Sequence, residues 1–70
     1  MNNVSTPGEQ HVQTITNCLA RADDWRRQAD HLRDHADQPH LAPSVSTVLL
    51  REAVAADQMA ECWVAAADKA

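Results

Sequence analysis

The chain has 70 residues, which is enough for one small domain with a marginal hydrophobic core. Its net charge of −4 and its interleaved acidic and basic residues offer no basic patch for phosphates, so we expect it not to bind nucleic acid. Alanine, valine and leucine carry most of the apolar content, phenylalanine and tyrosine do not occur, and only one glycine is present. This composition predicts an all-α protein.

The N-terminal stretch MNNVSTPGEQ lacks the basic and apolar regions of a signal peptide. No run approaches the roughly 20 apolar residues that cross a bilayer, so we expect a cytoplasmic protein with no membrane association. Residues 1–5 are predicted to form a disordered tail, followed by a helical hairpin over residues 6–70. Arginine outnumbers lysine five to one, which is typical of a GC-rich bacterial or phage genome.

The first helix is predicted over residues 7 to about 38. Thr6 is a candidate N-cap, Pro7 fits the first helical position, and Glu9 completes a capping box. Pro39 disfavours a helical conformation at Gln38 and ends the helix there. The helical repeat places eight apolar residues in one stripe along this helix: Ile15, Cys18, Leu19, Ala22, Trp25, Ala29, Leu32 and Ala36.

The second helix is predicted from about residue 44 to residue 68. Two start signals are adjacent, because Pro43 fits the first helical position and Ser44 fits the N-cap. Its main face gathers nine apolar residues: Val45, Val48, Leu49, Ala56, Met59, Ala60, Trp63, Ala66 and Ala67. Leu50 and Val54 form a second apolar patch on nearly the opposite side.

A turn at residues 38–43 should fold the two helices into an antiparallel hairpin. With this turn, facing residues have numbers that sum to about 81, which pairs Ala22 with Met59 and Ile15 with Ala66. One hairpin cannot cover all of the apolar surface, so we expect two hairpins to dimerise into a four-helix bundle. Binding to a different, larger protein is the alternative.

The predicted interface comprises Trp25, Leu32, Leu50, Val54 and Trp63. The first four lie at the edge of the apolar stripe or outside it, and Trp63 is included because tryptophan is enriched in binding interfaces. The alternative for Leu50 and Val54 is ordinary scattered exposure, which is common on protein surfaces.

Glu52 falls on the main apolar face of the second helix, within a turn of Arg26 and Arg33 across the hairpin. A carboxylate at such a position should be paired, so we predict a structural ion pair within the hairpin or across a dimer. No nucleophile accompanies Glu52, and we therefore expect no catalytic residue and no enzymatic activity.

His31 and His35 have the i,i+4 spacing that places two imidazoles on one helical face, as zinc ligands require. His40 beyond the turn is a third candidate ligand. Leu32 stands where a zinc metalloprotease has glutamate, which excludes that hydrolase. We expect no cofactor, with zinc at these histidines as the alternative.

Cys18 and Cys62 lie at the same level of the predicted hairpin. A disulfide is conceivable there, but the absence of a secretion signal and the usual spacing of packed helices favour two reduced thiols.

These features predict a non-enzymatic protein–protein interaction module, such as a small regulator, adaptor or phage-type inhibitor that acts as a helical hairpin dimer. The alternative is a small metal-binding or metal-responsive helical protein that uses His31 and His35.

Overall fold

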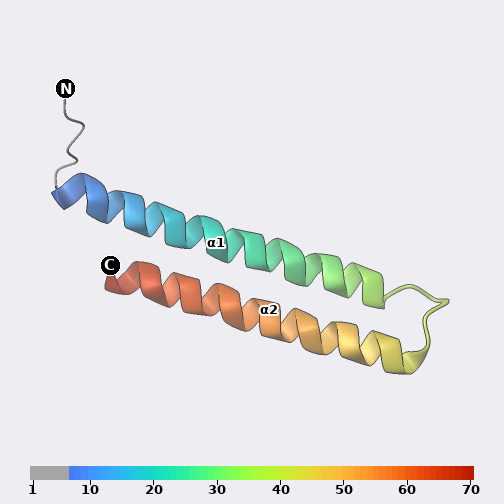
Figure 1. Ribbon diagram of the computed structural model, residues 1–70. Helices are drawn as coiled ribbons and strands as arrows, with labels where there is room; N and C mark the ends of the chain where they lie inside the picture. The colour runs from blue at the N-terminus through green and yellow to red at the C-terminus, as the bar shows by residue number, and fades with distance from the viewer. Residues whose placement is uncertain (1–6) are drawn as a thin grey trace.

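The computed structural model describes residues 7–70, which form an all-α, antiparallel two-helix hairpin (Figure 1). Helix α1 spans Pro7–Ala36, helix α2 spans Pro43–Lys69, and residues 37–42 connect them. The prediction of two antiparallel helices is confirmed. Thr6, predicted as an N-cap, and the predicted tail of residues 1–5 lie outside the described residues.

Helix α1 ends two residues before the predicted boundary. The amide of Gln38 donates to the carbonyl of His35 at 3.2 Å, an i→i−3 bond that tightens the chain after the last helical turn. Pro39 has no amide proton and cannot continue the helix. The amide of Leu41 then donates to the carbonyl of Gln38 at 3.3 Å, which closes the turn toward α2.

Helix α2 uses proline as its start signal. Ala42 is the N-cap, with φ −64° and ψ 144°, and Pro43 follows as the first helical residue without a side-chain cap. Ser44 is therefore not the cap. Ser46, in the first turn, donates its hydroxyl to the carbonyl of Ala36 at 3.0 Å. This bond satisfies one of the last carbonyls of α1, which have no partner within their own helix, and ties the two helices together at the turn.

The contact between α1 and α2 is made of small side chains. Among residues 8–70, the buried hydrophobic residues are six alanines and one cysteine: Cys18, Ala22, Ala29, Ala53, Ala56, Ala60 and Ala67. Ala29 and Ala53 are completely buried and form the centre of the contact together with Ala56. Because no large side chain separates the helices, their axes can approach at the short end of the usual 8–10 Å range.

The predicted pairing of facing residues is wrong by about one residue on α2. Met59, predicted to face Ala22, is 40% exposed, whereas Ala60 is buried beside it. Likewise Ala66 is exposed and Ala67 is buried. Helix α2 is thus rotated so that its alanines, including Ala53, which the predicted face omits, meet α1. Close approach of two helices favours small residues over valine and methionine.

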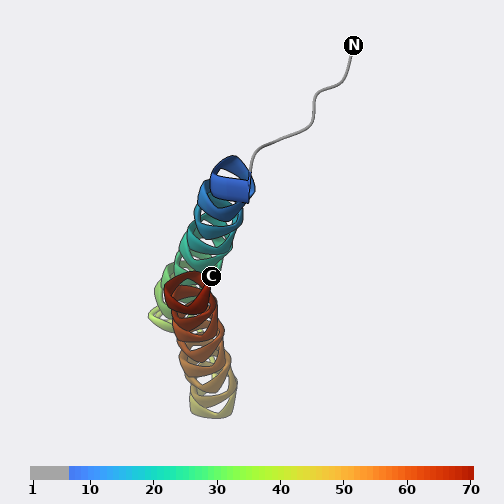
Figure 2. The ribbon, with the colours of Figure 1, turned by 90° about the vertical axis from the view of Figure 1, so that its left-hand side faces the viewer.

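The hairpin is a single layer of two helices, and both of its broad sides are open (Figure 2). Its radius of gyration is 17.2 Å, whereas a compact domain of this length has about 11 Å. Among the described residues, neither helix combines the length and the apolar character needed to cross a membrane. Because both broad sides are open, the hairpin buries only the line of contact between its helices.

Candidate interaction surface

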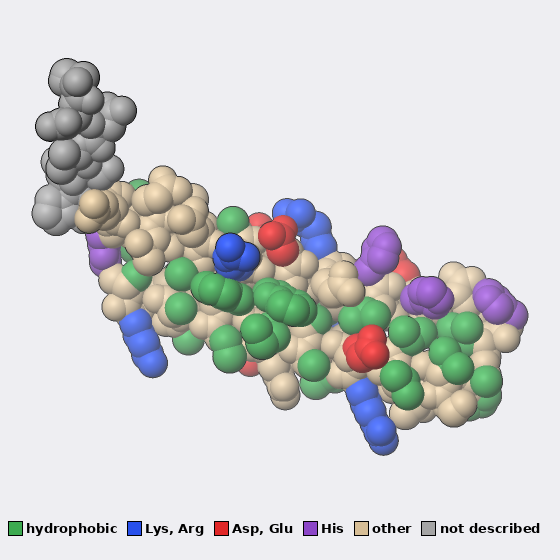
Figure 3. Space-filling model, viewed as in Figure 1, with side chains coloured by type: hydrophobic (Ala, Val, Ile, Leu, Met, Phe, Trp, Pro, Cys, Tyr) green, Lys and Arg blue, Asp and Glu red, His purple; other side chains and the backbone are tan. Residues whose placement is uncertain are grey.

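One broad side of the hairpin carries both tryptophans, and we call it the tryptophan face. It comprises residues placed on the same flank of their helices by the helical repeat: Trp25, Leu32, Val45, Val48, Met59 and Trp63. Trp25 and Leu32 pack against the central alanines and are half-buried. Val45 and Val48 are 44% and 50% exposed. Hydrophobic side chains extend over both helices on the side shown in Figure 3.

Arg21 and Glu52 stand among the apolar side chains of the tryptophan face, and Asp24 lies beside Arg21 at its edge. The guanidinium carbon of Arg21 lies 5.5 Å from the centroid of the Trp63 ring, a cation–π contact that stabilises an exposed site by about 0.5–1 kcal/mol. Sequence reasoning missed this contact, because facing residues with numbers that sum to about 81 place Trp63 opposite residue 18 instead of Arg21. Glu52 lies on the same flank of α2 as Trp63 and is exposed.

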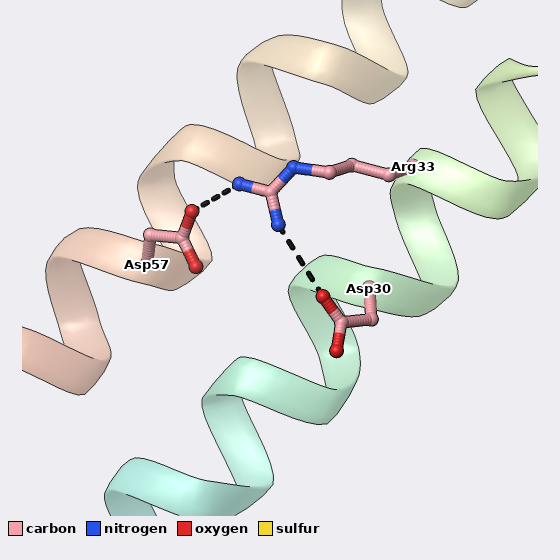
Figure 4. A network of polar contacts seen from close by, with 3 residues as sticks. All are labelled: Asp30, Arg33 and Asp57. Atoms are coloured by element: carbon pink, nitrogen blue, oxygen red, sulfur yellow. Dashed lines mark hydrogen bonds and ion pairs between the residues drawn. The ribbon is translucent and has the colours of Figure 1, made fainter.

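The predicted ion pair of Glu52 with Arg26 or Arg33 within the hairpin is wrong. Arg33 bridges the helices by pairing with Asp57, and it also contacts Asp30 at 3.5 Å (Figure 4). Glu52 stands on the opposite flank of α2 from Asp57, so Arg33 cannot serve both. An ion pair of Glu52 across a dimer stays a prediction.

The reverse side of the hairpin, which we call the acidic face, carries exposed Leu19, Leu50 and Val54. Acidic side chains lie among them on both helices and at the start of the connection: Asp23, Asp30, Asp37, Asp57, Glu61 and Asp68. The ion pair between Arg33 and Asp57 belongs to this face, and both of its side chains are more than one third exposed. Such an ion pair contributes at most about 1 kcal/mol to stability.

The five predicted interface residues do not form one surface. Trp25, Leu32 and Trp63 belong to the tryptophan face, whereas Leu50 and Val54 belong to the acidic face, where they are 48% and 54% exposed. A single partner that covers one side of the hairpin therefore leaves the other set in water.

The three histidines near the turn lie close to one another but do not form a ligand cluster. His31, His35 and His40 are exposed and line one open depression together with Asp34 and Gln38. Among the described residues, no group of three or more histidine, cysteine or acidic side chains is arranged to hold a metal ion.

The two cysteines are free thiols in different environments. Cys18 is buried in the contact between the helices, whereas Cys62 is exposed. Counting 100° per residue, Cys62 lies half a turn away from Ala53, on the side of α2 that faces away from α1. The two thiols therefore point in directions that do not meet.

No protein-family model matches the chain, and neither a curated protein nor a solved structure matches it significantly.

Proposed function

We propose that the chain is a non-enzymatic protein–protein interaction module, a helical hairpin that dimerises into a four-helix bundle. It would serve in the cytoplasm as a small regulator, adaptor or phage-type inhibitor. One observation supports this proposal above the others: within residues 8–70, the buried side chains are no larger than cysteine, while seven large hydrophobic residues are 40–62% exposed. Removing such surface from water contributes about 25 cal/mol per Å², and association is the way to remove it.

A second argument comes from the stability of the hairpin itself. Most of the stability of protein helices comes from packing of their apolar faces rather than from intrinsic propensity. Here the packed surface is a line of alanines, each of which contributes only about the 0.8 kcal/mol of one buried methyl group. Small domains usually need an additional source of stability, and a second subunit provides one.

Size-exclusion chromatography with light scattering tests this proposal. We expect a mass of twice the 7.7 kDa of the chain at micromolar concentration. Dilution should lower the mass and the helical circular dichroism signal together, since the hairpin gains stability from its partner. A chain that stays monomeric and fully helical at every concentration would contradict the proposed dimer.

A metal-binding or metal-responsive protein that uses His31 and His35 is the alternative function. Its support is the placement of His31, His35 and His40 around one depression. Titration calorimetry with zinc at neutral pH tests it, with a His31→Ala/His35→Ala variant as the control. Heat in the wild type that is lost in the variant would favour this function, and no heat at micromolar protein would refute it.

A further inference from the structure

We infer that the tryptophan face binds a second copy of this chain, packed face to face and running in the opposite direction. In this arrangement Glu52 of each copy pairs with Arg21 of the other. The inference rests on the proposed dimer and specifies its surface, its orientation and the charges that fix both.

The charges of the two faces select the tryptophan face. The acidic face carries six carboxylates but, by the helical repeat, two arginines, Arg26 and Arg33, so two copies joined through it would bring an excess of like charges together. By contrast, the tryptophan face carries Arg21 and Glu52, one charge of each sign, among its apolar side chains, and Asp24 stands beside Arg21 at its edge. A surface with one charge of each sign is complementary to itself when a two-fold axis exchanges them.

The positions of these two charges select the orientation. Because Ala29 packs against Ala53, Glu52 stands about level with residue 30 of α1, nine residues from Arg21 and about 14 Å along the helix. The midpoint between the two charges falls near Trp25, which is also the middle of the length over which α1 and α2 pack. A two-fold axis across the helices at Trp25 therefore brings Glu52 of each copy level with Arg21 of the other.

The parallel arrangement of two tryptophan faces lacks this match. With both copies running in the same direction, Arg21 of one copy lies level with Trp63 and Met59 of the other, and Glu52 lies level with Leu32. Both charges would then be buried against apolar side chains without a partner, which is strongly unfavourable. The antiparallel arrangement is the one that covers the apolar residues and pairs the charges.

The area of the tryptophan face is sufficient for a stable dimer. The packed part of the hairpin is about 40 Å long and two helices, or about 20 Å, wide. Each copy therefore offers about 800 Å², which equals the area per partner of a standard protein–protein interface. Trp25 and Trp63 are half-buried in the hairpin, and the dimer would complete their burial. Tryptophan is enriched among the residues that dominate binding energy.

Charge reversal in the full chain tests the inference, with the dimer dissociation constant measured by sedimentation equilibrium. Glu52→Arg and Arg21→Glu should each raise the dissociation constant about a hundredfold or more, since each places two like charges together in the interface. The double variant Arg21→Glu/Glu52→Arg should return to within about tenfold of the wild type. Glu61→Arg, an equivalent change on the acidic face, is the matched control and should leave the constant unchanged.

The comparison of Arg21→Glu with the double variant isolates the intermolecular pair, because both lack the contact of Arg21 with Trp63. Recovery in the double variant also shows that the fold tolerates both substitutions. Single variants that dimerise like the wild type, or a double variant no better than Arg21→Glu, would overturn the inference. If Glu61→Arg dissociates the dimer instead, the dimer stands but uses the other face; a monomeric wild type would reject the proposed dimer itself.

Discussion

Replacing Ala53 with leucine tests whether the hairpin depends on close contact between its alanines. Ala53 is completely buried against Ala29 and Ala56, so the three additional carbons of leucine have no space. Overpacking of this kind costs about 1–3 kcal/mol. For a domain of this size, each kcal/mol corresponds to about 4–8 °C, and we expect Ala53→Leu to lower the melting temperature by about 5–20 °C.

Ala55→Leu is the matched control for this change. Ala55 is exposed on the same helix, so the substitution has the same effect on helix propensity but disturbs no contact with α1. We expect its free energy of unfolding to stay within about 0.5 kcal/mol of the wild type. Thermal unfolding should be followed by circular dichroism at one fixed protein concentration, because association shifts the midpoint. A melting temperature of Ala53→Leu equal to or above that of the control would refute the close alanine contact.

Two further predictions concern the turn and the thiols. Ser46→Ala removes the hydrogen bond to the carbonyl of Ala36, and we expect its free energy of unfolding to be about 1 kcal/mol lower than that of Ser44→Ala. Ser44 is exposed, so Ser44→Ala is the control with the same gain in helix propensity. Equal stability of the two variants in denaturant titrations would show that the bond contributes nothing. A maleimide reagent should label Cys62 rapidly in the native protein and Cys18 only after denaturant is added, as peptide mass spectrometry can establish. Labelling of both thiols at the same rate would contradict the burial of Cys18.

The helices and their turn are largely predictable from the sequence, because the signals are local. Pro7 marks the start of α1, Pro43 marks the start of α2, and Pro39 forbids continuation between them. The rotation of α2 about its axis is not local. Hydropathy ranks Val48 and Met59 above alanine and includes both in a predicted face that omits Ala53, whereas packing at short distance selects the line through Ala53. A hydrophobic stripe identifies the inward half of a helix but not which members of the stripe lie deepest.

The ion pairs were mispredicted for a related reason. A pairing by level along the hairpin sets Arg33 near Glu52, yet Arg33 reaches Asp57, more than one turn further along α2. Helical side chains lean toward the N-terminus of their own helix. In an antiparallel pair these directions oppose each other, so a long arginine on α1 and a carboxylate further along α2 lean toward one another. Level alone therefore assigns a long side chain such as that of Arg33 to the wrong partner.

The alanine contact and the exposed apolar faces have one cause. Two helices that approach along alanines leave no room between them for valine, leucine, methionine or tryptophan, so these side chains are displaced to the flanks on either side. A contact lined with leucine would bury more apolar surface within the hairpin and leave less for another molecule to cover. Because the chain packs its helices through its smallest apolar residues, its larger ones remain available for the proposed association.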